Sequence, residues 1–204
     1  LAIFGLGPGS IEERRERGRL AWILLLACVP GAIAGLLLED KAETAFRNPV
    51  LVAGTLAAMG LVMLLADRYC RGSRGIGEAR VKDGLFIGVA QALALIPGVS
   101  RSGITISAGL MRHLSREDAA RFSFLLSVPI TLGAGVFSSL GMARDGIPVA
   151  EMTPFIVGTV VSAVVGYVTI AFLLDYLRKH DLRLFVYYRW ALAAVILILA
   201  LIRG

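Results

Sequence analysis

Cysteine and histidine are scarce in this chain, with two residues of each among 204. Cys28 lies inside an apolar block and Cys70 lies in a basic stretch, and no CxxC pair or Cys/His spacing occurs. A disulfide framework and a metal site are therefore not indicated, and we assign no metal ligands. His113 and His180 both lie in basic loops, where histidines are usually solvated, so we expect neither to be catalytic.

Charged residues are also few, at 18%, whereas hydrophobic residues make up 57% and the mean hydropathy is +0.77. The apolar residues form long blocks and no amphipathic rhythm, which predicts an all-α integral membrane protein with one domain. The net charge of +6 comes from basic residues in short stretches between these blocks. Cytoplasmic loops have this pattern, so we infer membrane topology and not nucleic-acid binding.

Five blocks are long enough to cross a bilayer, since about 20 apolar residues in a helix span the ~30 Å hydrocarbon core. We expect transmembrane helices over residues 19–38, 49–66, 122–143, 154–174 and 185–202, after a loop over residues 1–18. Pro30 and Pro129 fall inside these spans, where neighbouring helices can satisfy the carbonyl groups that a proline frees.

A sixth apolar block, residues 84–111, is interrupted by Pro97 and Gly98. The interruption leaves arms of about 13 and 9 residues, each too short to cross a membrane alone. A re-entrant helical hairpin therefore fits this block better than a transmembrane helix.

The charges of the loops support the hairpin independently. If the hairpin returns to the side from which it entered, four basic stretches lie in the cytoplasm: residues 14–19, 68–82, 112–121 and 178–183. A block that crossed fully would place residues 112–121 outside and weaken the bias of basic residues toward the cytoplasm.

Arg101 is the only charged residue between Gly84 and Met111. A guanidinium cannot be deprotonated in a protein and is costly at membrane depth, which indicates a bound anion. The turn feeds a short helix whose N-terminal N–H groups favour anions. Ser100, Ser102 and Thr105 add hydroxyl donors, and Ser102 suits the N-cap of an arm that begins at Gly103. These groups predict a site for a diphosphate whose hydrocarbon tail remains in lipid.

Other polar residues have structural explanations. Ser107, Ser123 and Ser127 are expected to bond to helix carbonyl groups or to neighbouring helices. Ser115 precedes acidic residues and suits an N-cap. For Gln91 two explanations stay open: a hydrogen bond to an adjacent helix, or a place in the lining of the anion cavity.

The sequence of residues 90–107, AQALALIPGVSRSGITIS, resembles the second signature of the bacterial undecaprenyl-diphosphatase family of the bacitracin-resistance type. The resemblance continues through residues 114–116 and 119–129 and covers nearly the whole chain from Arg19 onward. It implies hydrolysis of undecaprenyl diphosphate to undecaprenyl phosphate and inorganic phosphate. This reaction recycles the lipid carrier for peptidoglycan synthesis and confers resistance to bacitracin.

The resemblance also implies a fold of two inverted repeats, each with a re-entrant hairpin, whose tips meet at the site. By this resemblance Arg101 and Ser100 are the catalytic residues, and Gly98, Ser102, Gly103, Thr105 and Gln91 bind the substrate. The implied partners are a polyprenyl diphosphate, the membrane and a second copy in a homodimer. The implied location is the bacterial inner membrane, which a multi-pass chain crosses several times.

Nothing before Arg19 resembles the family's first hairpin, which carries two glutamates and a histidine beside a serine-rich turn. The chain also begins with Leu1, and we therefore expect it to be N-terminally incomplete. A divalent cation, Mg²⁺ or Ca²⁺, is compatible with this chemistry, but its ligands and the general acid or base match no residue of this sequence.

Two other classes of function stay open at this point. Broken helices whose N-termini face a midplane anion also occur in transporters, so a carrier or flippase for an anionic lipid or phosphate is the alternative. A structural remnant without activity is the third interpretation.

Overall fold

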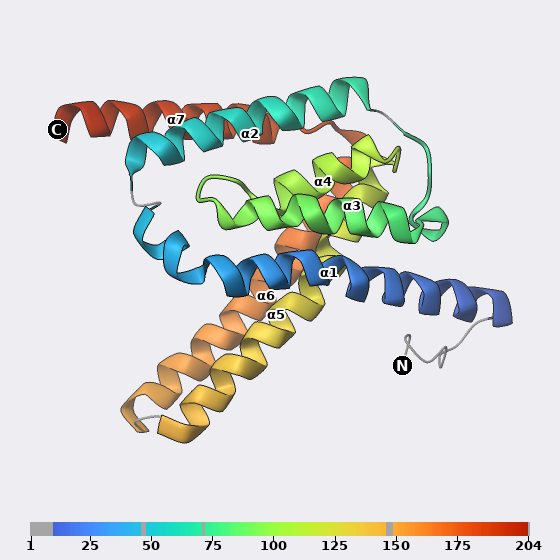
Figure 1. Cartoon of the computed structure of the whole chain (residues 1–204), viewed down its shortest axis with the longest axis horizontal. Helices are drawn as coiled ribbons and strands as arrows, with labels where there is room; N and C mark the ends of the chain where they lie inside the picture. The colour runs from blue at the N-terminus through green and yellow to red at the C-terminus, as the bar shows by residue number, and fades with distance from the viewer. Residues whose placement is uncertain (1–9, 46–47, 71, 146–148, 204) are drawn as a thin grey trace.

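The computed structural model describes residues 10–45, 48–70, 72–145 and 149–203, and side chains for most of them. The described residues form long α-helices and contain no named strand (Figure 1). In chain order the α-helices are α1 Ile11–Ala45, α2 Pro49–Tyr69, α3 Val81–Ala92, α4 Arg101–Met111, α5 Arg116–Asp145, α6 Val149–Lys179 and α7 Arg183–Arg203. Five of them, α1, α2, α5, α6 and α7, are long and apolar enough to cross a membrane, which confirms the predicted all-α membrane fold.

Helix α1 begins earlier than the sequence suggested. Residues 11–18 are helical, although we predicted a loop over residues 1–18; residues 1–9 lie outside the described part. The reason is local, because Ser10 and Glu13 form a reciprocal capping box. The Ser10 hydroxyl accepts the Glu13 N–H at 3.2 Å, and the Glu13 carboxylate accepts the Ser10 N–H at 3.3 Å. Two of the free donors at the helix start are thereby satisfied.

Helices α3 and α4 form the hairpin that the sequence predicted. After α3 the chain makes a short 3-10 helix, Leu93–Leu95, then a turn, and returns as α4 beside α3 (Figure 1). Gly98 at the turn has a φ of 89°, a conformation that L side chains rarely adopt. A Cβ at this position would also lie 2.0 Å from the Thr55 hydroxyl oxygen. Glycine is therefore required here both by its backbone conformation and by the close approach of α2.

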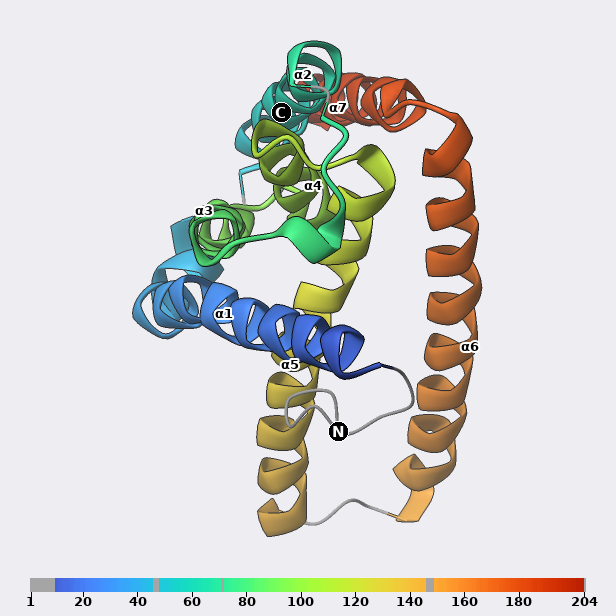
Figure 2. The same cartoon turned by 90° about the vertical axis from the view of Figure 1, so that its right-hand side faces the viewer.

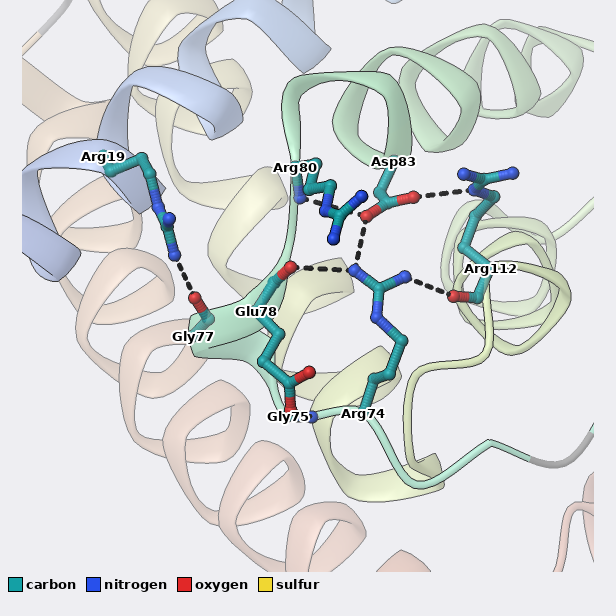
Figure 3. A network of polar contacts seen from close by, with 8 residues as sticks. All are labelled: Arg19, Arg74, Gly75, Gly77, Glu78, Arg80, Asp83 and Arg112. Atoms are coloured by element: carbon teal, nitrogen blue, oxygen red, sulfur yellow. Dashed lines mark hydrogen bonds and ion pairs between the residues drawn. The ribbon is translucent and has the colours of Figure 1, made fainter.

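The two ends of the hairpin are joined by a polar network around Asp83, which is 1% exposed (Figure 3). Its carboxylate accepts hydrogen bonds from the Arg74 guanidinium at 3.0 Å, the Arg112 guanidinium at 2.7 Å and the backbone N–H of Arg80 at 3.0 Å. Arg74 also donates to the carbonyl group of Arg112 at 2.9 Å. We call these four residues the hairpin clamp. Since it joins the start of α3 to the end of α4, the two ends of the hairpin lie together, as the predicted re-entrant hairpin requires.

Asp83 is charged in the clamp despite its burial. Burial alone would raise the pKa of this carboxyl group. The hydrogen bond from the Arg80 backbone and those from Arg112 and Arg74 outweigh burial, and the pKa of Asp83 lies below its ordinary value.

Helix α3 packs closely against α1 because small residues line the contact. A Cβ on Gly88 would lie 2.2 Å from the carbonyl oxygen of Ala27, and a Cβ on Gly84 would lie 2.5 Å from the Ile23 side chain. Ile23, Ala27 and Ile87 are buried in the same apolar cluster. Backbones that approach this closely gain dispersion contacts, the main source of helix association in lipid.

Helices α5 and α6 both extend away from the hairpin, and most of α6 stands apart from α5 (Figure 2). Ala119, Phe122 and Leu126, in the first half of α5, are fully buried, whereas Val157, Val161 and Val165 of α6 are more than half exposed. Exposed apolar side chains along a membrane-length helix are accommodated by the hydrocarbon of the bilayer.

We expect Asp83→Asn to lower the free energy of unfolding by about 2–3 kcal/mol, because an amide cannot neutralise the two guanidinium groups that remain. Thermal unfolding in detergent measures the change. Asp175→Asn is the matched control: Asp175 is 64% exposed and pairs with Lys179 one turn away, so its loss should cost less than about 0.5 kcal/mol. Equal losses in the two variants would contradict a structural role for the clamp.

The clamp also predicts an acid dependence. Because the pKa of Asp83 is lowered by folding, its stabilisation is complete above the pKa of the unfolded chain and is lost as the pH falls through the folded value. The difference in stability between the unaltered protein and Asp83→Asn should therefore be constant from pH 7 to about pH 5 and shrink below about pH 4. A difference that instead grows on acidification would show that Asp83 is not charged in the folded protein.

Candidate functional site

The first turn of α4 is capped by Ser100, and our prediction of Ser102 as the N-cap is wrong. The Ser100 hydroxyl accepts the N–H of Gly103 at 3.1 Å, and the helix begins at Arg101, two residues earlier than expected. Ser102 lies within the first turn, and its hydroxyl oxygen is 3.2 Å from that of Ser100. Two hydroxyl groups thus lie together at the positive end of the α4 dipole, where N–H groups without intrahelical acceptors favour an anion.

The turn before α4 is held from two other helices. Thr55 of α2 donates a hydrogen bond to the carbonyl oxygen of Pro97 at 2.6 Å. Arg189 of α7 donates one to the carbonyl oxygen of Gly98 at 3.2 Å. A turn inside an apolar block leaves carbonyl groups without helical partners, and such groups cost several kcal/mol in hydrocarbon. These two side chains satisfy them and fix the turn's position.

A cavity of about 150 Å³ lies beside the start of α4. Its polar lining comes from Ser100, Ser102 and Arg189. The remaining walls are mostly apolar and come from α2, α4, the end of α6 and the start of α7: Met63, Gly103, Ile106, Leu173, Leu177, Leu182, Phe185 and Tyr188. Hydroxyl groups, a guanidinium and apolar walls in one place suit an anion that is attached to a hydrocarbon chain.

Arg101 is not part of the lining of this cavity. Its side chain is exposed, and it has no hydrogen bond or ion pair with any residue whose side chain the structure describes. An unpaired guanidinium next to a helix N-terminus is free to bind phosphate oxygens with a forked pair of hydrogen bonds.

Thr105 and Gln91 face neighbouring helices, α5 and α1, and not the turn. Thr105 is 1% exposed, donates to the Arg101 carbonyl oxygen at 2.7 Å and lies 2.6 Å from the hydroxyl oxygen of Ser123 in α5. Gln91 is 5% exposed and lies against Gly31 of α1, where a Cβ would come within 2.9 Å of its amide nitrogen. Among the residues that the structure describes, neither polar atom of the Gln91 amide group has a hydrogen-bond partner. The structure therefore brings Gly98, Ser100, Ser102 and Gly103 together, and places these two residues on other faces of the hairpin.

Sequence reasoning missed Arg189. The signal was present, because Arg189 is the only charged residue between Phe185 and Ile202. The argument that selected Arg101, a lone guanidinium in an apolar block, applies equally here. The sequence alone did not reveal that Arg189, which is far from Arg101 along the chain, lies at the same turn.

Both histidines lie outside the turn and outside the lining of the cavity. His113 follows α4, at the end of the hairpin opposite to the turn, with a φ of 62°. Eleven helical residues separate it from Ser100, which at ~1.5 Å per residue amounts to roughly 16 Å. His180 stacks on Tyr176 with ring centroids 4.4 Å apart. Ser115 caps α5 as predicted, since its hydroxyl accepts the Asp118 N–H at 3.1 Å.

Within the described residues, no group of three or more His, Cys, Asp or Glu side chains is placed to hold a metal ion. The cavity beside α4 has no carboxylate or imidazole in its lining either. The groups that the structure places here are thus suited to binding an anion and neutralising its charge.

Comparison with known proteins points to one family. The sequence profile of the family described as "Bacitracin resistance protein BacA" matches residues 4–195. A protein of Moorella thermoacetica named "Undecaprenyl-diphosphatase" is 48% identical over 197 residues, which are 96% of this chain and 72% of that protein. Proteins of the same name from Pelotomaculum thermopropionicum and Geobacter metallireducens are 47% and 45% identical, and the matches cover 73% and 72% of their lengths.

We expect Gly98→Ala to destabilise the turn, because alanine at positive φ costs about 1–2 kcal/mol and its Cβ would meet the Thr55 hydroxyl. The thermal midpoint in detergent should fall clearly. Gly54→Ala in α2 is the control: nothing lies within 4 Å of a Cβ there, and alanine is the better helix former by roughly 1 kcal/mol. A Gly98→Ala protein as stable as the unaltered one would show that the turn has another conformation.

Proposed function

The chain belongs to the BacA family of bacitracin resistance proteins, and on this premise we propose that it is an undecaprenyl-diphosphatase. It hydrolyses undecaprenyl diphosphate to undecaprenyl phosphate and inorganic phosphate, which returns the lipid carrier to cell-wall synthesis. A carrier or flippase is not favoured, since the three relatives named above carry the name of the hydrolase.

The observation that carries the proposal for the site is the unpaired guanidinium of Arg101 at the N-terminus of α4. A diphosphate at this position would receive hydrogen bonds from Arg101 and from backbone N–H groups of the first turn. The hairpin is surrounded by apolar helices, so the prenyl chain would remain in hydrocarbon. Substrate head group and tail then both lie in surroundings that match their polarity.

The reaction transfers a phosphoryl group to water. A water oxygen forms a bond to the terminal phosphorus, the bond from that phosphorus to the bridging oxygen breaks, and undecaprenyl phosphate leaves with the electron pair. Negative charge spreads over the equatorial oxygens in the transition state, so positioning and charge neutralisation supply most of the catalysis. We assign this role to Arg101 and to the N–H groups of the α4 N-terminus.

Ser100 is suited to assist Arg101. Its hydroxyl oxygen accepts the Gly103 N–H, and when the Ser102 hydroxyl is the donor of the pair that these two serines form, the Ser100 hydrogen can be donated to a phosphate oxygen. Gly98, Ser102 and Gly103 surround the same turn and form the rest of the proposed binding site, whereas Thr105 and Gln91 face α5 and α1.

A divalent cation, Mg²⁺ or Ca²⁺, would arrive with the diphosphate. Within the described residues no group of three or more His, Cys, Asp or Glu could hold the ion, so phosphate oxygens would be its ligands. We further propose that the protein lies in the bacterial inner membrane with the hairpin clamp on the cytoplasmic side, because most basic residues gather at that end. A homodimer stays a prediction.

We expect Arg101→Ala to reduce phosphate release from undecaprenyl diphosphate by about 100-fold or more, the usual loss when a preorganised group at a transferring centre is removed. Arg101→Lys keeps the charge but not the forked hydrogen bonds, and should lose less. The assay measures phosphate release by the purified protein in detergent. Circular dichroism verifies that each variant is folded. Near-normal turnover by a folded Arg101→Ala protein would contradict the assignment.

Ser115→Ala is the matched structural control. Ser115 caps α5 at the clamped end of the hairpin and contacts neither the turn nor the cavity. The loss of the cap should cost about 1 kcal/mol of stability and leave turnover unchanged. A large loss of turnover with normal stability would place the chemistry at the other end of the hairpin.

A further inference from the structure

Arg189 is a second guanidinium at the turn, and it comes from α7 instead of from the hairpin. It is partly buried in the apolar stretch of α7, and one of its N–H groups donates to the carbonyl oxygen of Gly98 at 3.2 Å. A guanidinium has five N–H donors. Within the part of the chain whose side chains are described, Arg189 makes no ion pair and no other hydrogen bond, so its charge is uncompensated there.

The cavity next to Arg189 is built to receive a negative charge. Arg189, Ser100 and Ser102 all line it, and so does Gly103 from the first turn of α4. The guanidinium, two hydroxyl groups and the positive end of a helix dipole thus face one space whose lining holds no carboxylate. Its volume of about 150 Å³ is well above the ~10–15 Å³ that a single water needs.

An uncompensated cation in apolar surroundings is unfavourable, and a bound anion removes that cost. Arg101 and Arg189 reach the turn differently, since Arg101 is exposed outside the cavity and Arg189 lines it. A diphosphate has two phosphate groups, so two guanidinium groups at one turn match its charge distribution.

We propose that Arg189 binds the substrate diphosphate directly and is the second phosphate-binding arginine of the site. One of its N–H groups holds the Gly98 carbonyl oxygen, and the others donate to phosphate oxygens in the cavity beside Ser100 and Ser102. This inference rests on the proposed function. It adds a substrate contact from α7, a helix outside the hairpin, and makes the distance between α7 and the turn a determinant of affinity.

The competing role for Arg189 is to support the turn and nothing else. Glutamine separates the two roles: its amide can still donate to the Gly98 carbonyl group, but it has no charge for a phosphate. Lysine keeps the charge and loses the forked geometry. Arg183, at the start of the same helix, supplies the control, because it is 54% exposed, pairs with Asp181 and lines no part of the cavity.

The experiment is isothermal titration of inorganic diphosphate into the purified full chain in detergent, which requires no turnover. Arg189→Ala and Arg189→Gln should each weaken binding by about 10-fold or more, the loss expected for a hydrogen-bonded charge pair. Arg189→Lys should weaken it less, and Arg183→Ala should leave it within about twofold. The emission of Trp190, whose indole N–H donates to the Ala57 carbonyl oxygen at 3.1 Å, reports whether α7 still packs on α2 in each variant.

Normal diphosphate affinity in Arg189→Gln would overturn the inference and leave Arg189 as a support of the turn. Weakening in Arg101→Ala without weakening in any Arg189 variant would likewise overturn it and leave the proposed function intact. Absence of diphosphate binding by the unaltered protein would contradict the proposed site itself. Should Arg189→Ala alone lose its native Trp190 emission, the Gln and Lys variants decide the question.

Discussion

The demand that every backbone polar group in hydrocarbon find a partner governs this structure. A hairpin that turns inside an apolar block breaks its own helical hydrogen bonds at Pro97 and Gly98, and other helices must replace them. Thr55 and Arg189 do so from α2 and α7, and Ser100 caps the helix that follows. The residues that make the turn possible are thus the ones that surround the proposed anion site. The same side chains thus satisfy the backbone groups of the turn and form the proposed anion site.

The hairpin is fixed at both ends, and this fixes the α4 N-terminus in space. At the turn, α2 and α7 hold its carbonyl groups; at the other end, Asp83 joins Arg74 of the preceding loop to Arg112 at the end of α4. Between them α4 packs on α3 and α5 with Thr105, Ser107 and Leu110 buried. Preorganised donors need no reorganisation when charge develops on a substrate, which is the general source of their catalytic value.

Much of the fold follows from the lengths of the apolar segments in the sequence. Five long apolar blocks predict five membrane-length helices, and the Pro97–Gly98 break with its short arms predicts the hairpin. The directions of side chains do not follow in the same way. Thr105 faces Ser123, and Gln91 faces Gly31, because the rotation of α4 and α3 is set by packing against α5 and α1. Whether Arg189 meets the turn likewise depends on how α7 lies against α2, a contact between residues far apart in the chain. Caps are decided within one turn, and there the error at Ser102 came from placing the helix start two residues late.

The clamp has a consequence for how the chain enters the membrane. Asp83, Arg74 and Arg112 are charged, and all three lie where the two ends of the hairpin meet. In the re-entrant topology that we propose, neither end has to be translocated, and those charges need not enter the bilayer interior during biogenesis. Only Arg101 travels inward, and its entry is assisted once α1 is in place, because the glycine face of α3 already has a partner there. Helix α1 is synthesised before the hairpin. It therefore provides a docking surface by the time the two short arms, which cannot insert by themselves, are made.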